Sequence, residues 1–195
     1  TNDTVFALTT YSNTLRIGGS FTSSGGLVTN RVSLWNGSTW GAMPSTGSNG
    51  VNNTVYALTV LGSDLIIGGV FTQSIGGVTI NRICRYNSGS GVYTAMGTGI
   101  DQGQVNALSV FTNQLYAGGT FTTIGGSAVN RLARWTGSNW NTVGTGANGP
   151  VKSFFPRGSD IVIGGNFSSP QNNIASWNGS TFGAFGSGIS GGAAT

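Results

Sequence analysis

The sequence has little charge of either sign. It contains no glutamate and no histidine, one lysine, one cysteine and four aspartates, and charged residues make up only 6% of it, against roughly 25% in an average globular domain. Without histidine, Ser-His-Asp and Cys-His catalysis are excluded and the commonest metal ligand is missing. A single cysteine excludes an internal disulfide. Cys84 lies in an alternating apolar run, which predicts a small core residue and not a reactive thiol.

Other classes of protein are disfavoured by what the chain does not contain. Its charge of +4 and pI near 9.7 come from seven arginines and one lysine over four aspartates, without any basic run, so we expect no nucleic-acid partner. No stretch approaches the ~20 apolar residues of a membrane span. The first three residues resemble a linker and not a signal peptide, which indicates a mature or trimmed end. Disorder is disfavoured because the 37% of hydrophobic residues recur at fixed positions.

What the sequence does contain is a fourfold repeat. Five columns recur in register: a valine, a diglycine 13 residues later, a phenylalanine three residues after the first glycine, and two aromatic residues. Repetition of this kind decides the fold. The columns are Val5, Val55, Val105 and Val151; Gly18-Gly19, Gly68-Gly69, Gly118-Gly119 and Gly164-Gly165; Phe21, Phe71, Phe121 and Phe167; Trp35, Tyr86, Trp135 and Trp177; and Trp40, Tyr93, Trp140 and Phe182.

Local patterns within one copy indicate only β-strands. Apolar residues alternate at period two, the turns carry Ser12-Asn13 and Asn36-Gly37, and the second of these is a strong hairpin signal. The strands expected in the first copy are 5–9, 15–17, 32–35 and 39–43. We therefore predict an all-β fold, a β-propeller of four blades with four antiparallel strands each, possible also as part of a larger ring. It would form a single domain over 1–195, with blades at 4–53, 54–103, 104–149 and 150–195.

The recurring residues have architectural explanations. A diglycine at the same strand end marks a place where neighbouring blades crowd. The phenylalanine column should fill the space between sheets, and the two aromatic columns should pack as cross-strand partners. The fourth copy lacks four residues between Phe167 and Asn172 and has Asn173 in place of an arginine, as a terminal repeat that caps a stack can. Two arrangements stay open: a closed four-bladed ring, and an arc completed by further chain or by another subunit.

These motifs carry a family resemblance. An apolar strand that ends in Gly-Gly, followed by an aromatic residue and a later strand that opens with tryptophan, resembles kelch-type propeller blades. The fuller string, from Gly118-Gly119-Thr120-Phe121-Thr122 to Asn130-Arg131-Leu132-Ala133-Arg134-Trp135, is similar to the kelch-like repeats of bacterial, fungal and viral surface proteins, including fungal cortical polarity markers. The resemblance covers nearly the whole chain. It implies an extracellular or particle-surface setting and says little about activity.

The sequence contains few residues suited to catalysis. Asp64 and Asp160 occupy the same Gly-Ser-Asp turn in two copies, and Asp3 and Asp101 lie in linkers. An aspartate repeated in a turn is a turn former first, and no pair of carboxylates suited to glycoside hydrolysis is evident. Calcium binding at Asp101 has no supporting ligand spacing. The copper chemistry of kelch-like oxidases is not carried over, because its histidine ligands are missing. We expect no enzyme, no catalytic residue, no cofactor and no metal.

One column invites a functional interpretation: Arg31, Arg82 and Arg131, each preceded by asparagine. An arginine at a strand start can donate to carbonyl oxygens of the adjoining blade, which is a structural role. Alternatively, the three residues could form a ring of donors suited to sulfated or acidic glycans or to the carboxylates of a partner.

The sequence is compatible with three functions to different degrees. The first is a non-enzymatic structural or adhesive surface module, a rigid scaffold for protein–protein assembly on a virion, fibre or cell envelope, with protein partners or self-association. The alternative is a lectin-like, glycan-binding propeller, which the differing loops between the second and third strands weaken. An intracellular adaptor is disfavoured by the composition.

Overall fold

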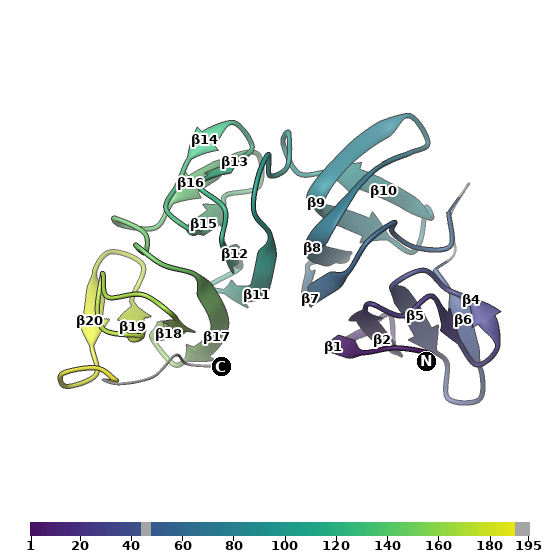
Figure 1. The fold of residues 1–195 in the computed structure, drawn as a ribbon, viewed down its shortest axis with the longest axis horizontal. Coiled ribbons are helices and arrows are strands. Elements are labelled where there is room, and N and C mark those ends of the chain that lie inside the picture. Colours follow the sequence, from purple (N-terminus) through teal and green to yellow (C-terminus); the bar gives the residue numbers. More distant parts are fainter. Residues whose placement is uncertain (44–47, 190–195) are drawn as a thin grey trace. The chain divides into compact units, whose positions relative to one another are not determined.

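The computed structural model describes residues 1–43 and 48–189, and all the regular structure in these residues is β-strand. The chain divides into two compact units, unit 1 over residues 1–99 and unit 2 over residues 100–195, which Figure 1 colours purple to blue and green to yellow. Over the described ranges, no helix is long and apolar enough to cross a bilayer.

Unit 1 holds two four-stranded antiparallel sheets. Blade 1 has the order β1-β2-β5-β6 and blade 2 the order β7-β8-β9-β10. Each strand therefore pairs with the next along the chain, apart from a short hairpin inserted between β2 and β5. The strands are β1 (Val5–Tyr11), β2 (Thr14–Gly19), β5 (Val32–Trp35), β6 (Trp40–Ala42), β7 (Val55–Leu61), β8 (Asp64–Ile75), β9 (Val78–Asn87) and β10 (Val92–Ala95).

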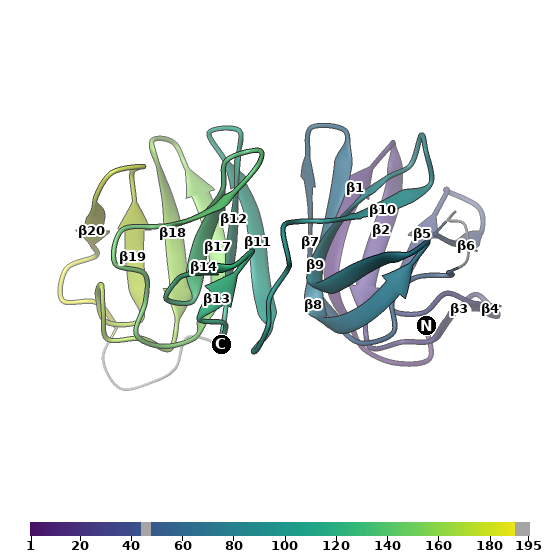
Figure 2. The same cartoon turned by 90° about the horizontal axis from the view of Figure 1, so that it is seen from above.

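Unit 2 repeats this plan. Blade 3 has the order β11-β12-β15-β16 and blade 4 the order β17-β18-β19-β20, and Figure 2 shows the strands of blade 4 side by side in that order. The strands are β11 (Val105–Phe111), β12 (Gln114–Gly119), β15 (Leu132–Trp135), β16 (Trp140–Thr142), β17 (Val151–Arg157), β18 (Asp160–Gly165), β19 (Ile174–Trp177) and β20 (Phe182–Ala184). The predicted four blades of four antiparallel strands are confirmed, whereas the single domain and its blade limits stay predictions.

The turns follow the residues that were predicted to form them, with one difference. Ser12 and Asn13 have φ of 49° and 59° and connect β1 to β2, as a two-residue hairpin requires. The hairpin at Asn36-Gly37 has a four-residue loop instead, because Trp35 pairs with Trp40. The Asn36 side chain causes this, since its Oδ1 accepts hydrogen bonds from the backbone N–H groups of Ser38 and Thr39 at 2.9 and 2.8 Å. Such local capping is typical of asparagine.

A second hairpin projects between the second and third strands of three blades, and sequence analysis treated it only as a loop. In blade 1 it is β3 (Ser23–Ser24) and β4 (Leu27–Val28), and in blade 3 it is β13 (Thr123–Ile124) and β14 (Ser127–Ala128). In blade 2 it is continuous with β8 and β9. The second diglycine of each of these copies forms its turn with positive φ, a conformation that favours glycine. Blade 4 lacks that diglycine and has no such hairpin among the described residues.

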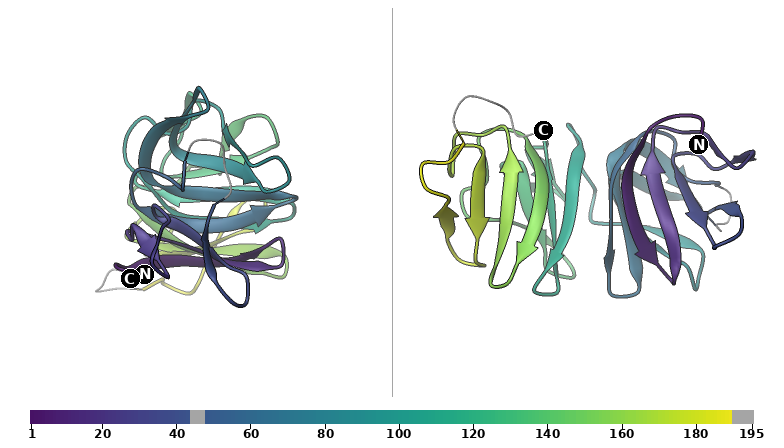
Figure 3. Two further views of the ribbon diagram at one scale, coloured as in Figure 1. Left: turned by 90° about the vertical axis from the view of Figure 1, so that its right-hand side faces the viewer. Right: turned by 90° about the horizontal axis from the view of Figure 1, so that it is seen from below.

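The first strand of every blade contains a β-bulge at the same place. In blade 1, Val5 pairs with Gly19 and Ala7 with Gly18, so Phe6 is an extra residue. The same register shift occurs in β7, β11 and β17, where the extra residues are Tyr56, Asn106 and Lys152. The first strand is also an edge strand in each sheet, and Figure 3 shows that of blade 1 in purple.

The aromatic columns pack as predicted. The residues of the phenylalanine column are between 0% and 4% exposed. The two aromatic residues on the third and fourth strands face each other in every blade, with ring centroids between 4.8 and 5.3 Å apart and tilted planes, a favourable arrangement. Each unit also has its own core between its two blades.

At the diglycine, neighbouring segments of backbone and side chain come too close to leave room for a Cβ atom. A Cβ atom on Gly18 would lie 2.6 Å from Val55 Cγ1 of blade 2, and one on Gly118 would lie 2.4 Å from Val151 Cγ1 of blade 4. The first glycine is therefore covered by the first strand of the next blade in the same unit. The second glycine lies against its own first strand, since a Cβ on Gly69 would lie 2.1 Å from the carbonyl oxygen of Thr54.

Candidate interaction sites

The Asn-Arg column has a backbone role in every blade. Arg31, Arg82 and Arg131 have φ of 66°, 63° and 59°, and Asn173, at the equivalent place in blade 4, has φ of 62°. This left-handed region is unusual for arginine and easier for asparagine. The recurrence of the conformation, and not a shared side chain, is what unites the four blades at this position.

Hydrogen bonds explain why this conformation recurs. The Arg31 N–H donates to the Phe21 carbonyl oxygen at 2.8 Å, and the Arg31 carbonyl oxygen accepts from the Gly19 N–H at 2.9 Å. Arg131 makes the same pair of bonds with Phe121 and Gly119, and Asn173 with Phe167 and Gly165. The residue thus joins the buried phenylalanine to the diglycine at the start of the third strand.

The preceding asparagine and the arginine side chain secure the linker that leaves the blade. Asn130 Nδ2 donates to the Thr145 carbonyl oxygen at 2.9 Å, and Arg131 Nη1 donates to that of Ala147 at 3.3 Å. Asn81 makes the equivalent bond to Thr98 at 3.0 Å. The three arginine residues are half-buried. A structural role is evident for their shared backbone conformation, while recognition of a partner or glycan by Arg31, Arg82 and Arg131 stays a prediction.

Two substitutions of Arg131 separate the backbone requirement from the side chain. Both Arg131→Asn and Arg131→Val remove the guanidinium group, but only valine is β-branched and strained at φ of 59°. We expect Arg131→Asn to lower the free energy of unfolding by less than about 1 kcal/mol and Arg131→Val by about 2 kcal/mol. Urea unfolding followed by circular dichroism measures the difference. Equal losses would show that the left-handed backbone is not the constraint.

The aspartates act locally. Asp160 accepts hydrogen bonds from Arg157 Nη2 at 2.8 Å and Nε at 3.1 Å within its turn, and this arginine holds the pKa of Asp160 below its usual value. Asp64 accepts a hydrogen bond from Asn87 Nδ2 at 2.8 Å. Asp101 accepts one from Thr123 at 3.3 Å. In the part of the chain that the structure describes, no three His, Cys, Asp or Glu residues form a group that could hold a metal ion.

Cys84 is confirmed as a core residue. It is fully buried and free, and burial raises the pKa of its thiol. Because the thiolate is the reactive species, this environment keeps the side chain inert.

One feature escaped sequence analysis: an exposed apolar face on β1. Val5 is 36% and Leu8 65% exposed, whereas their equivalents Val55 and Leu58 in blade 2 are 0% and 8% exposed. The columns are alike in sequence, so the difference comes from what covers them. In unit 1, Val55 and Leu58 lie over Gly18 of blade 1, whereas the described residues of unit 1 leave Val5 and Leu8 exposed.

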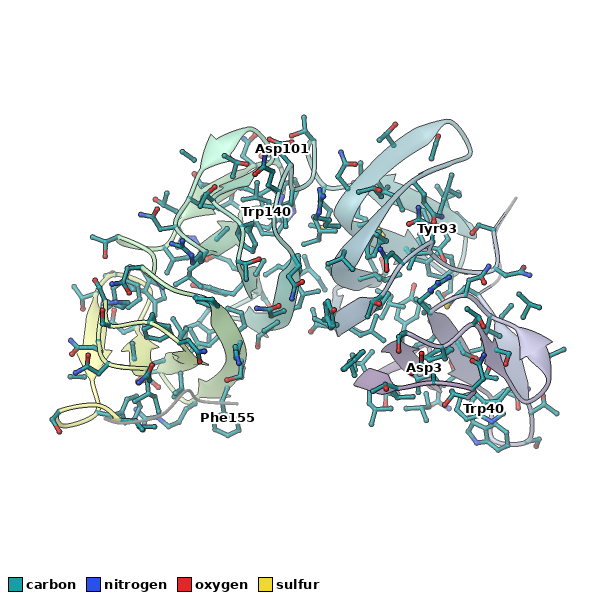
Figure 4. The ribbon with its side chains drawn as sticks, in the orientation of Figure 1. Asp3, Trp40, Tyr93, Asp101, Trp140 and Phe155 are labelled. Atoms are coloured by element: carbon teal, nitrogen blue, oxygen red, sulfur yellow. The ribbon has the colours of Figure 1, made fainter. Side chains whose placement is uncertain are left out.

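The complementary face occurs in unit 2. A Cβ on Gly118 would contact Val151 and Phe154 of the next blade, whereas a Cβ on Gly164 would meet, among the described residues, only Ser153 Oγ of its own sheet. On the same blade Phe155 is 66% exposed, and Figure 4 shows its side chain pointing away from β17. Among the described residues of unit 2, the diglycine of blade 4 is therefore not covered by a valine of another blade, as that of blade 3 is.

Four blades, each of four antiparallel strands with a buried phenylalanine and a paired aromatic at fixed positions, define a β-propeller protein. The comparison with family profiles gives the particular family. The chain belongs to the family of the Rax2 C-terminal beta propeller domain, whose profile matches residues 38–193. This agrees with the propeller repeats of fungal cortical markers in the resemblance stated above.

Solved structures agree on the fold. The computationally designed Ika4 protein superposes with a TM-score of 0.54 at 14% identity, over 91% of this chain and 92% of that one. The extracellular domain of BT4673 from B. thetaiotaomicron, described as a one-component system, gives a TM-score of 0.60 at 13% identity over 90% of this chain. This chain spans only 21% of the BT4673 chain. A search of curated proteins found no match.

Proposed function

We propose that this domain is a non-enzymatic structural or adhesive scaffold, exposed at an extracellular or particle surface, which assembles with a second copy of itself through the exposed face of blade 1. The observation that carries the proposal is the exposed Val5 and Leu8 on β1. Propeller folds serve many functions, so the fold alone does not assign one.

The chemistry of the chain favours a scaffold over an enzyme. The sequence has neither histidine nor glutamate, which are the usual general bases. Its thiol is buried, and the bonds of Asp64, Asp101 and Asp160 serve turns and linkers. The proposal therefore assigns no cofactor, and it treats the rigidity of the sheets as the property that is used.

The repeat itself indicates which surface would cover blade 1. Within unit 1 the Val55 and Leu58 side chains cover Gly18, and within unit 2 Val151 and Phe154 cover Gly118. Val5 and Leu8 present the same pattern, so a diglycine face of a blade of this type is the surface that fits them. In a second copy, Gly164 of blade 4 offers that face. An interface between two different surfaces is heterologous, and it builds rings or filaments according to whether its rotation closes.

The surface setting rests on composition and resemblance. Charged residues make up 6% of the sequence, and hydroxyl and amide side chains supply most of its polarity. The BT4673 domain is described as extracellular. The repeat motifs of this chain also resemble those of fungal cortical polarity markers, which are surface proteins. The lectin-like alternative is less favoured, because the fourth-strand aromatic residues of blades 2 and 3, Tyr93 and Trp140, are only 2% and 3% exposed and are not accessible as stacking platforms.

A charge placed on the exposed face of β1 should weaken assembly. We expect Leu8→Asp to weaken self-association roughly tenfold or more, because a carboxylate would be buried against an apolar surface. Leu27→Asp is the matched control, since Leu27 is also an exposed leucine of unit 1, at 49%, but lies on the β3–β4 hairpin. Sedimentation velocity over a wide concentration range measures both variants against the unaltered chain.

Two outcomes would contradict the proposal. If the unaltered chain sediments as a monomer at all concentrations, or if Leu27→Asp disrupts assembly as much as Leu8→Asp, the face of blade 1 is not the interface. Sulfated or acidic glycans retained on an array by a monomeric chain, and lost on Arg82→Ala, would favour the lectin-like function instead.

A further inference from the structure

The interior of unit 1 contains an arginine that sequence analysis did not single out. Arg16 lies in the middle of β2, where it pairs with Thr9 of β1 and Leu34 of β5, and it is only 4% exposed. Its Nε and Nη1 atoms are buried, and no described residue accepts a hydrogen bond from either. A buried, charged donor without an acceptor is costly, so this group requires an explanation.

The surroundings of Arg16 are aromatic and come from both blades of unit 1. The guanidinium lies 5.4 Å from the centroid of the Tyr11 ring. The Tyr86 ring lies 6.4 Å from the Tyr11 ring and 4.9 Å from the Tyr93 ring, so an aromatic cluster of β1, β9 and β10 surrounds the guanidinium. Tyr93, labelled in Figure 4, is 2% exposed and its hydroxyl also has no partner among the described residues. The Tyr11 hydroxyl is engaged, since it donates to the Ser63 carbonyl oxygen at 2.9 Å.

The chain has no acidic residue left to neutralise Arg16. It contains four aspartates and no glutamate. In unit 1, Asp3 accepts hydrogen bonds from Thr4, and Asp64 accepts one from Asn87 and lies 4.0 Å from Arg85. In unit 2, Asp160 pairs with Arg157 and Asp101 accepts a hydrogen bond from Thr123. Desolvation lowers the pKa of Arg16, but an arginine remains charged in proteins. The tyrosine ring provides only partial compensation.

We propose that the Arg16 guanidinium and the Tyr93 hydroxyl bind a chloride ion inside unit 1, between β2 and the β9–β10 pair. Chloride fits the requirements of the group: it carries the missing negative charge, and it accepts hydrogen bonds from several donors at once. A water molecule would satisfy the donors but leave the charge unpaired. The proposal is independent of the assembly described above.

The test is the dependence of thermal stability on chloride. A ligand that binds only the folded state raises the melting temperature with its concentration, so we expect a rise of about 3 to 5 °C for each tenfold increase in sodium chloride above the dissociation constant, with sodium gluconate keeping the ionic strength constant. In Arg16→Met the chloride dependence should vanish, and the apolar replacement is tolerable because buried ion pairs can often be exchanged for apolar residues. Arg85→Met is the matched control and should retain the dependence, since Arg85 is 42% exposed.

Crystals of the unaltered chain give a second measurement that needs no variant. Soaking them in sodium bromide should place an anomalous scatterer within hydrogen-bonding distance of Arg16 Nε or Nη1. Equal melting temperatures in chloride and gluconate, or a chloride dependence that persists in Arg16→Met, would overturn the proposal. So would a water molecule without anomalous signal at this place.

Discussion

Replacing Gly69 with alanine is expected to lower the free energy of unfolding by about 3 to 4 kcal/mol, because the added Cβ would clash with backbone atoms that are held in place by hydrogen bonds. It would lie 2.1 Å from the Thr54 carbonyl oxygen and 3.0 Å from Val55 Cα. The same carbonyl oxygen accepts a hydrogen bond from the Val70 N–H at 3.0 Å. Any shift that relieves the clash therefore also breaks this bond and moves the first strand of blade 2.

Gly89→Ala is the control for this substitution. Gly89 lies in the same blade, and an added Cβ there would be 3.2 Å from Asn87 Oδ1, the end of a side chain in an exposed turn. We expect a loss of less than about 1 kcal/mol. Urea unfolding of both variants by circular dichroism gives the comparison. Similar, small losses for the two would mean that β7 and β8 do not approach each other as closely as described.

Truncating the phenylalanine column should have an effect of similar size through a different mechanism. Phe121 is fully buried, and its backbone carbonyl oxygen accepts the hydrogen bond from Arg131. Phe121→Ala leaves that bond intact and removes only the ring. We expect a loss of about 3 to 5 kcal/mol from the resulting cavity and the lost burial.

Phe155→Ala provides the comparison within unit 2. Phe155 is 66% exposed, so removal of its ring should change the free energy of unfolding by less than about 0.5 kcal/mol. Thermal and urea unfolding of the two variants together test whether burial, and not aromatic content, sets the stability. A cost for Phe155→Ala close to that of Phe121→Ala would contradict the difference in burial.

The repeat made much of this fold predictable. A residue that must be buried in one blade must be buried in all, so four copies of the phenylalanine and of the aromatic pair identify core positions without any alignment of other proteins. The prediction extends to contacts, since Trp35 and Trp40 pair as expected. The hairpin at the second diglycine was missed because its strands have only two residues each in blades 1 and 3, too few for a period-two pattern.

The candidate sites were less predictable, because they depend on departures from the repeat. Arg16 occupies a column that holds Ile66, Tyr116 and Val162 in the other copies, and this mismatch was the available signal of a buried charge. The left-handed backbone of the Asn-Arg column cannot be read from arginine, although Asn173 in the fourth copy hinted at it. The exposure of Leu8 and the burial of Leu58 depend on how the two sheets of unit 1 pack on each other, which the residue type alone does not indicate.

The bulge in the first strand also determines how these blades can associate. β7 has the sequence VYALTVL, an apolar, β-prone edge segment of the kind that recruits other chains into cross-β aggregates. A bulge at the same place in β1, β7, β11 and β17 twists the edge and interrupts its hydrogen-bonding row. Strand addition along that edge is thereby discouraged, while the flat faces remain available. Neighbouring blades can then stack through side chains without templating amyloid growth.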